Sequence, residues 1–463
     1  MQKAAPQKSK SEIISEFASG LTWDDIPGAV RERAKLQILD ALGTGLASHA
    51  YPFAATSLEG IEALGGAGTC SVLGSTLRLS ARDAALANGL LMHGLDFDDT
   101  HLGSIIHATV ACLPAALAIG EQIGASGRDM LVAYVAGMET AIRVGMAADG
   151  RFHHTGFHAT AIASHFSSAV IAGKLLGLDA DALTRAQGIA VSTASGIQVF
   201  LEEGAWTKRL HPGWGAAAGI TAAVLAQRGF KGPRRPYEGK FGLFETHFQS
   251  EAAGVDQEQL VAGLGRTWLL AETAIKPYPV CHFIHGCADA AIELSRELSA
   301  ADIAEVEALL PEPTLPIVAE PHAAKIVPTT DYEAKFSAQF VIATCLARGK
   351  FGLAELKDSA FADPELLDLA AKVACKADPE TAFPTFFSGG VNVKLRDGRV
   401  ISRHVRVNSG AGERMLDVDG VSGKFRACAA MTTPADKAER VRAVALALEQ
   451  HSARDLGEAL RAG

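Results

Sequence analysis

Three carboxylates fall within four residues, at Asp96, Asp98 and Asp99, shortly after His93. If a helix continued through this segment, His93, Asp96 and Thr100 would share one face and Asp98 would point away. Crowding of like charges raises the pKa of at least one carboxylate, which suits a general base. Two other interpretations stay open, namely an N-cap for the next helix and a magnesium site, although no second acidic motif follows.

Histidines surround a glycine turn further along the chain, where His153 and His154 precede Gly156 and His158 comes directly before an apolar helical stretch. A helix start offers unpaired N–H groups and the positive end of the helix dipole, so an anion would bind beside His158. In the alternative interpretation the turn is simply capped, and His153 and His154 are surface imidazoles.

Two fixed cations and an imidazole precede a very apolar stretch, in the order Lys208, Arg209 and His211. Lys or Arg at this position would pair with carboxylates of a ligand. Pro212 is expected to end any helix that precedes it, and Gly213 allows close approach of another backbone. The alternative is a solvated basic turn.

A fourth group, Lys276, Tyr278, Cys281, His282 and His285, follows two prolines that favour an extended approach. A helix is expected to begin at about Cys281. Lys276 would otherwise be a solvated loop cation. Cys281 and His285 stand four residues apart, so a zinc pair is conceivable, but no second pair supports it. As a nucleophile Cys281 would need the helix N-terminus, and a buried inert thiol is the simpler interpretation.

The elements that must position these groups are helical up to about residue 267, with no strand expected before that point. Apolar spacing predicts helices over 28–48, 80–92, 105–123, 128–147, 159–176 and 214–228. The pattern then changes. Strands are expected at 303–310 and 315–319, and a hairpin at 390–396 and 399–407 about Asp397-Gly398. Further helices are expected over 284–298, 333–348, 363–373 and 433–461.

We therefore predict a mainly α chain made of a large all-helical domain and a smaller α+β domain. The helical domain would cover residues 1–267, the α+β domain 268–408, and residues 409–463 would return to the helical domain.

The composition limits the classes of function. The 463 residues are 48% hydrophobic and 21% charged, which indicates a globular protein with a sizeable core. A net charge of −9 without a basic run argues against nucleic acid or an anionic membrane as the partner. The opening residues 1–10 are polar and unlike a secretory signal, and no apolar stretch reads as a membrane span. Seven scattered cysteines suggest reduced thiols, so a cytoplasmic location is expected.

Taken together, the residues indicate proton abstraction next to a carboxylate. A developing enolate-like charge needs cations directed at it, and a departing hydroxide needs a positioned acid, while carbon dioxide needs a fitted exit. No metal or organic cofactor is required. The residues alone predict a cofactor-free lyase or isomerase of a small polycarboxylate.

The four segments, in this order, resemble the MmgE/PrpD family. The matching strings are N-G-x-x-x-H-x-x-D-F-D-D-T at 88–100, G-F-H-x-T at 156–160, K-R-L-H-x-G-W at 208–214, K-x-Y-P-x-C-x-x-x-H at 276–285 and A-K-F-S at 334–337. They extend over nearly the whole chain.

The resemblance implies a helical domain with a small α+β lid domain, usually in a homodimer, and an active site in the cleft between domains. It also implies a di- or tricarboxylate substrate and no iron–sulfur cluster. Carried over by position, the catalytic residues would be Asp96, His107, His158, Lys208 and Lys276. The lysines would bind substrate carboxylates, His158 or His107 would move the proton, and Asp96 would orient or share it. Further substrate contacts are expected from Thr100, Arg209, His211, Tyr278, Cys281 and His282.

The family contains 2-methylcitrate dehydratases, cis-aconitate decarboxylases and iminodisuccinate epimerases, and the chain departs from each. The decarboxylases tend to carry His where Cys281 stands, although His282 is adjacent. The dehydratases usually have Pro where Ala108 follows His107, and the epimerases lack the Lys-Arg-Leu-His string at 208–211. The sequence therefore favours dehydration of the 2-methylcitrate type as the reaction. The alternative is decarboxylation, or epimerisation of a dicarboxylate, and a more remote alternative is a non-catalytic binding protein.

Overall fold

The computed structural model describes residues 7–462; residues 1–6, which belong to the polar opening, and Gly463 lie outside the described residues. The chain divides into two compact units, a helical unit of Met1–Thr273 with Val418–Gly463 and an α+β unit of Ala274–Asp417. The predicted fold class, mainly α with a smaller α+β domain, is confirmed. The domain boundaries predicted from the sequence fall a few residues before these.

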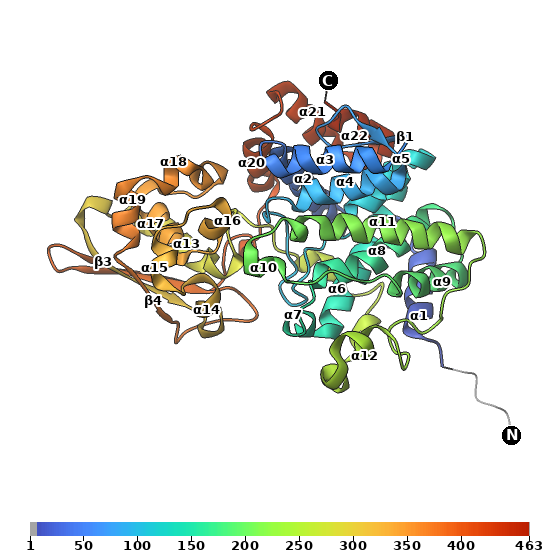
Figure 1. Cartoon of the computed structure of the whole chain (residues 1–463), viewed down its shortest axis with the longest axis horizontal. Helices are drawn as coiled ribbons and strands as arrows, with labels where there is room; N and C mark the ends of the chain where they lie inside the picture. Colours follow the sequence, from blue (N-terminus) through green and yellow to red (C-terminus); the bar gives the residue numbers. More distant parts are fainter. Residues whose placement is uncertain (1–6, 463) are drawn as a thin grey trace. The chain divides into compact units, whose positions relative to one another are not determined.

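The helical unit is built mostly from α-helices (Figure 1). These are α1 (Lys10–Gly20), α2 (Gly28–Ser48), α3 (Pro52–Leu64), α4 (Ala81–His93), α5 (Leu113–Ile123), α6 (Gly127–Ala148), α7 (Arg151–His154), α8 (Ala159–Leu175), α9 (Ala180–Val191), α10 (Phe200–Glu203), α11 (Thr207–Gln227), α12 (Leu243–Phe248), α20 (Val418–Ala429), α21 (Ala435–Leu446) and α22 (Ala453–Leu460).

Helices α4, α8 and α11 form the centre of this unit, with α11 packed against both of the others and α8 packed on α6 (Figure 1). Small residues allow the backbones to approach closely. A Cβ atom at Gly213 of α11 would lie 2.2 Å from the Leu86 carbonyl oxygen of α4, and one at Gly89 would lie 2.5 Å from Gly213 Cα. The close approach predicted at Gly213 is therefore confirmed, and it brings the first turns of α11 next to the end of α4.

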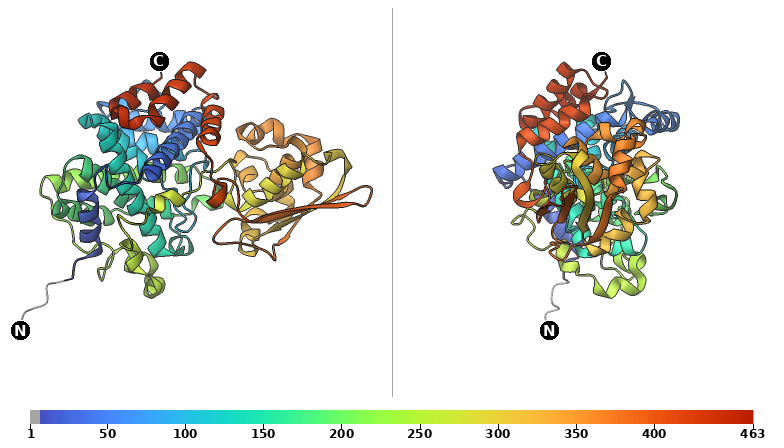
Figure 2. Two further views of the ribbon diagram at one scale, coloured as in Figure 1. Left: turned by 180° about the vertical axis from the view of Figure 1, so that it is seen from behind. Right: turned by 90° about the vertical axis from the view of Figure 1, so that its left-hand side faces the viewer.

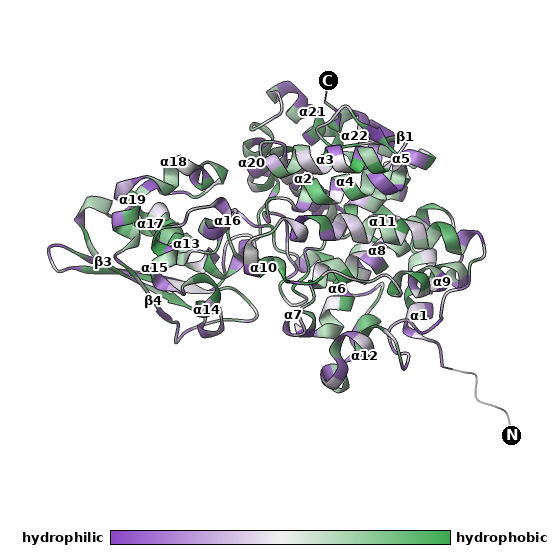
Figure 3. Ribbon diagram, viewed as in Figure 1, coloured by the Kyte–Doolittle hydropathy of each residue, from purple (hydrophilic) through white to green (hydrophobic). Residues whose placement is uncertain are grey.

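Helix α6 is long and apolar enough to cross a membrane by length and composition alone, but 94% of its most apolar window is buried inside the structure. Buried core helices of globular proteins have the same composition. Surface helices differ, as α3 shows with its mixture of hydrophobic and hydrophilic residues (Figure 3).

Three local predictions for the helical unit are wrong. Two short strands, β1 (Ala67–Ser71) and β2 (Arg78–Leu79), pair antiparallel before residue 267, and they are too short to show a clear alternation. The helix predicted over 105–123 begins only at Leu113, with Pro114 in its first turn. Pro212 lies inside α11, which continues to Gln227, and so it does not end a helix.

The C-terminal segment returns to the helical unit, where α20 and α21 pack on α2 (Figure 2). Lys424 of α20 forms an ion pair with Asp40 of α2, with 2.7 Å between Nζ and Oδ1 and both side chains buried. The same ammonium group donates to the Phe97 carbonyl and lies 3.8 Å from the centre of the Phe97 ring. The C-terminal helices therefore support the loop that follows α4.

The α+β unit contains a sheet of four strands in the order β4-β3-β5-β6. Its strands are β3 (Ile303–Leu310), β4 (Val373–Ala377), β5 (Gly389–Leu395) and β6 (Val400–Val405). Strands β3 and β4 are parallel, and the other two pairs are antiparallel. The predicted hairpin about Asp397-Gly398 is confirmed, since Gly398 has a φ of +90° that suits a tight turn.

Helices complete the α+β unit, and α13 packs on β5, β6 and α17. They are α13 (His285–Leu294), α14 (Leu315–Val318), α15 (His322–Ile326), α16 (Asp331–Lys335), α17 (Ala338–Arg348), α18 (Asp358–Phe361) and α19 (Pro364–Ala370). The strand predicted at 315–319 is wrong, because Leu315–Val318 forms α14 with Pro316 in its first turn, a position that proline favours.

Candidate active site

The carboxylates after His93 lie on an irregular loop between α4 and α5. Helix α4 ends at His93, so the face predicted for His93, Asp96 and Thr100 on a continuing helix does not form. Asp96 adopts a φ of +52° instead. This left-handed conformation is uncommon for a residue other than glycine, and such positions concentrate at functional sites.

Asp98 points inward from this loop, contrary to the prediction that it points away. Its Oδ2 atom lies 2.9 Å from His93 Nδ1 and 3.1 Å from His107 Nδ1, and its side chain is fully buried. Burial alone would raise the pKa of Asp98, but its electrostatic interactions and hydrogen bonds with the His93 and His107 rings outweigh this effect and hold the pKa well below its usual range. Asp98 is therefore an anion that joins two imidazoles.

Asp96 faces the first turn of α11. Lys208 Nζ donates to Asp96 Oδ2 at 2.7 Å, and each of these side chains keeps 16% of its surface exposed. Asp96 Oδ1 lies 3.5 Å from His107 Nε2. Burial lowers the pKa of His107, although the nearby Asp98 charge opposes this effect. His107 is thus a neutral imidazole with one ring nitrogen toward Asp98 and the other toward the Lys208–Asp96 pair.

His158 and His211 complete the cluster. His158 is the N-cap residue of α8, and its Nδ1 lies 3.0 Å from Nδ1 of His211 on α11. The His158 ring stacks on His93 with 5.6 Å between ring centres. Burial and the Lys208 charge lower the pKa of His158 well below its ordinary value, and burial with the His93 and Lys208 charges lowers that of His211 to about 4. Both rings are therefore neutral at pH 7, and one of the two Nδ1 atoms carries the hydrogen that the other accepts.

Asp99, the third carboxylate, has a different partner. It accepts the backbone N–H of Thr109 at 3.0 Å and also the Thr109 hydroxyl, which contacts the Tyr134 hydroxyl at 2.7 Å. Burial raises the pKa of Asp99 to about 7 even though these hydrogen bonds oppose it. Asp99 therefore holds the two ends of the loop together.

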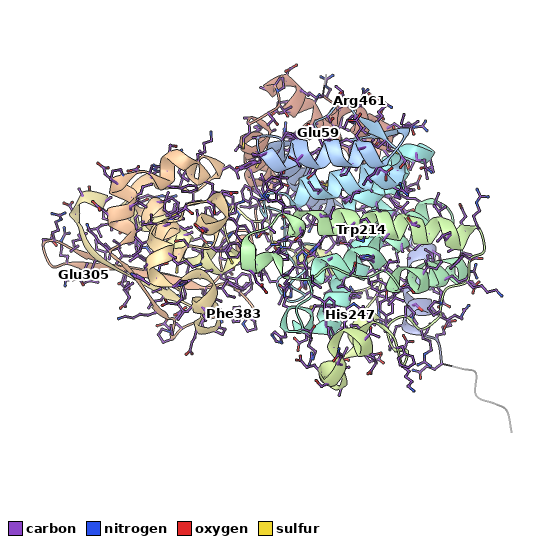
Figure 4. All side chains as sticks on the ribbon, in the orientation of Figure 1. Glu59, Trp214, His247, Glu305, Phe383 and Arg461 are labelled. Atoms are coloured by element: carbon purple, nitrogen blue, oxygen red, sulfur yellow. The ribbon has the colours of Figure 1, made fainter. Side chains whose placement is uncertain are left out.

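Thr100 and Arg209, two predicted substrate contacts of the helical unit, are placed differently. The Thr100 hydroxyl lies 3.5 Å from His107 Nδ1, inside the cluster. The Arg209 guanidinium lies over the Phe53 ring at 4.3 Å and near the Trp206 ring at 5.8 Å. Trp214, which is labelled in Figure 4, lies on the same helix. Its side chain is 51% exposed.

The α+β unit holds the remaining predicted residues. Lys276 and His282 are buried, and Cys281 is half-buried. The Tyr278 hydroxyl donates to Asp289 at 2.7 Å, and burial, with the Asp289 charge, raises the Tyr278 pKa. The His282 and His285 rings are 4.3 Å apart. Cys281 caps a short 3₁₀ turn at His282–Ile284, so the α-helix begins slightly later than predicted.

The metal interpretations can be compared with this geometry. Within residues 7–462, His93, Asp98 and His107 form the group of three possible ligands, with donor atoms within 4.8 Å of one another. Both Nδ1 atoms already lie at hydrogen-bonding distance from one carboxylate oxygen, which accounts for the arrangement. The magnesium interpretation fits less well, because Asp96, Asp98 and Asp99 turn to different partners.

In chemical terms the helical unit brings together one lysine, two carboxylates and four imidazoles. His93 and Asp98 were not among the predicted site residues. Their spacing in the strings at 88–100 was visible, but the turn that directs Asp98 inward was not. Neutral imidazoles beside an ammonium group can accept a proton while the cation stabilises an adjacent anion.

The chain matches two family models, the MmgE/PrpD N-terminal domain over residues 12–256 and the MmgE/PrpD C-terminal domain over residues 278–450. It is 27% identical over 472 residues to a cis-aconitate decarboxylase of Aspergillus terreus (strain NIH 2624 / FGSC A1156), covering 97% of this chain and 96% of that protein. The human cis-aconitate decarboxylase is 28% identical, with 93% and 90% covered. A 2-methylcitrate dehydratase of Cupriavidus necator is 24% identical, with 96% and 94% covered.

Proposed function

We propose a function from the premise that the chain belongs to the MmgE/PrpD family. The proposed function is that of a cofactor-independent lyase of a small di- or tricarboxylate. The relatives support an enzyme of this family, and the choice of substrate and leaving group is our proposal. One carboxylate of the substrate would bind Lys208, and a neighbouring histidine would transfer the proton at carbon.

The observation that carries this proposal is the half-buried Lys208–Asp96 pair beside His107. A lysine in this position has its charge partly shielded from water, so it can stabilise the enolate-like anion that forms next to a carboxylate. His107 accepts or delivers a proton between two carboxylates, and the imidazolium that forms is stabilised by both.

Two reactions fit this arrangement. In a decarboxylation, loss of carbon dioxide leaves a carbanion that must take up a proton. In a dehydration, a proton is first removed from carbon and hydroxide then leaves. We propose cis-aconitate-type decarboxylation as the first candidate, because the decarboxylase relatives are more similar than the dehydratase. The second candidate is 2-methylcitrate-type dehydration, which the sequence pattern favours. It is supported by Cys281, because decarboxylases tend to carry His at that position.

The experiment is to incubate the purified chain with citrate, 2-methylcitrate, cis-aconitate or iminodisuccinate in heavy water and to follow the products by NMR. Decarboxylation gives carbon dioxide and a product with one new carbon-bound deuterium. Dehydration gives an alkene and water, and epimerisation gives only exchange of a carbon-bound hydrogen. If none of the four is altered by the wild type, the proposed function fails. Treatment with a chelator should leave the rate unchanged, and a loss restored by zinc or magnesium would contradict independence from metal.

A further inference from the structure

A single buried oxygen atom connects two of the histidines in the helical unit. Asp98 Oδ2 lies 2.9 Å from His93 Nδ1 and 3.1 Å from His107 Nδ1, and the Asp98 and His93 side chains are fully buried. A carboxylate is an acceptor only, so it is satisfied best when each of these nitrogens carries the hydrogen. For a neutral imidazole, a hydrogen on Nδ1 leaves the lone pair on Nε2.

We propose that Asp98 is a positioning residue that fixes His93 and His107 in the tautomer with the hydrogen on Nδ1 and the lone pair on Nε2. This proposal rests on the proposed function for its catalytic consequence, because the fixed tautomer leaves His107 Nε2 as the basic atom. That atom lies 3.5 Å from Asp96 Oδ1, next to the carboxylate that holds Lys208. Without Asp98 the ring could adopt the opposite tautomer, in which Nε2 is a donor and cannot accept a proton.

The same carboxylate also supports the charged form of His107. When Nε2 takes up a proton, the imidazolium donates from Nδ1 to Asp98 and faces Asp96 from Nε2. Asp98 fixes the second ring as well, and that ring stacks on His158. A carboxylate that orients an imidazole and stabilises its protonated form is a known means of preparing a base.

The neighbouring Asp99 shows what a purely structural carboxylate in this loop looks like. It is as deeply buried as Asp98, but it accepts hydrogen bonds from the backbone N–H and the hydroxyl of Thr109. The pKa of Asp99 is raised, whereas that of Asp98 is lowered by the two imidazoles. Substitution of Asp98 removes a carboxylate that faces histidines, whereas substitution of Asp99 removes one that faces Thr109. The two substitutions therefore form a matched pair.

The test compares Asp98→Asn with Asp99→Asn in the full-length chain. The asparagine amide can donate to a ring nitrogen, so Asp98→Asn permits the opposite tautomer while conserving volume. We expect Asp98→Asn to lower kcat by at least about 10²-fold with KM changed less than about 3-fold, the size expected for a disabled general base. An asparagine at position 99 keeps an oxygen that accepts the Thr109 N–H, so the two ends of the loop stay tied together. Asp99→Asn is therefore expected to lower thermal stability and to reduce kcat by less than about 3-fold. Similar losses of kcat in both variants would overturn the proposal.

A second measurement does not depend on activity. Nitrogen NMR of the ¹⁵N-histidine-labelled protein, assigned with His93→Asn and His107→Asn, should show a protonated Nδ1 and an unprotonated Nε2 in both rings of the wild type. Asp98→Asn should change this pattern, and Asp99→Asn should not. The proposal is overturned if Nε2 of His107 is protonated in the neutral wild-type ring, or if the pattern is unchanged in Asp98→Asn. It is also overturned if the wild type holds a stoichiometric metal ion that Asp98→Asn loses. If no carboxylate is consumed but the tautomers respond as expected, the proposed function fails and the positioning role of Asp98 stands.

Discussion

Substitution of Lys208 by methionine is the most direct perturbation of the candidate site. Methionine conserves the length and much of the volume of the side chain but removes the ammonium group that donates to Asp96 at 2.7 Å. The change should lower kcat/KM for the substrate found in the heavy-water experiment, because the anion formed next to the substrate carboxylate loses its cation.

The magnitude follows from the contacts of the ammonium group. A hydrogen bond to a charged group contributes about 1.5–3 kcal/mol. Since about 1.36 kcal/mol corresponds to a factor of ten in rate, loss of one such bond lowers kcat/KM by about 10- to 150-fold. The substitution also leaves Asp96 without the lysine beside His107, so we expect the upper end, about 10²-fold. The effect on folding should be smaller, about 1 kcal/mol or less, because both side chains keep contact with water.

Lys174 provides the matched control. Its ammonium group donates to the carbonyls of Ala18 and Leu21 at 2.7 Å each, at the opposite end of α8 from His158. Lys174→Met should therefore lower the urea midpoint and leave kcat/KM within about 3-fold of the wild type. Steady-state kinetics of the two variants, with Lys208→Arg as a charge-conserving comparison, test the reasoning. It is refuted if Lys208→Met retains wild-type kinetics, or if Lys174→Met loses as much activity.

Three further predictions concern other residues. His158→Asn should lower kcat by at least about 10²-fold if His158 transfers a proton, and wild-type turnover would remove it from the site. Lys276→Ala should lower kcat/KM by about 10²-fold if Lys276 binds a substrate carboxylate, which a rate measured at low substrate concentration would detect. Burial lowers the pKa of His165 from 6.5 to about 4. As the pH falls, the unfolded chain therefore binds a proton at this residue before the folded chain does, and stability is lost between about pH 6.5 and 4. The free energy of unfolding, measured by urea denaturation, should change between pH 7 and pH 5 by about 2 kcal/mol less in His165→Asn than in the wild type, and equal acid sensitivity would contradict this.

The architecture was largely predictable because long amphipathic helices and an Asp-Gly hairpin leave clear patterns. The helices near 28–48, 128–147 and 159–176 and the hairpin after residue 389 all form. The strands at 67–71 and 78–79 were missed because two to five residues show no usable period. The helix at 315–318 was mistaken for a strand because a short apolar run is ambiguous between the two.

The chemistry of the site was predictable by residue type more than by geometry. Lys208, Asp96 and His158 were expected from their types and from the family strings, and His107 from its position in the resemblance. The structure places all four in one unit. Asp98 was not expected, because its direction depends on where α4 stops and on the backbone of the following loop. No periodicity describes a loop, so only the three-dimensional path could assign its carboxylates to their partners.

That path also explains how neighbouring carboxylates can have three different roles. Asp99 is tied to Thr109, and the Phe97 carbonyl is tied to Lys424 from the C-terminal segment. Each contact satisfies a backbone group of the loop, the Phe97 carbonyl near its start and the Thr109 N–H near its end. With the backbone held, Asp96 can keep its left-handed conformation and face Lys208, while Asp98, two residues later, faces His93. The site therefore depends on residues far away in sequence, and loosening the Lys424 contact should weaken the orientation of both carboxylates together.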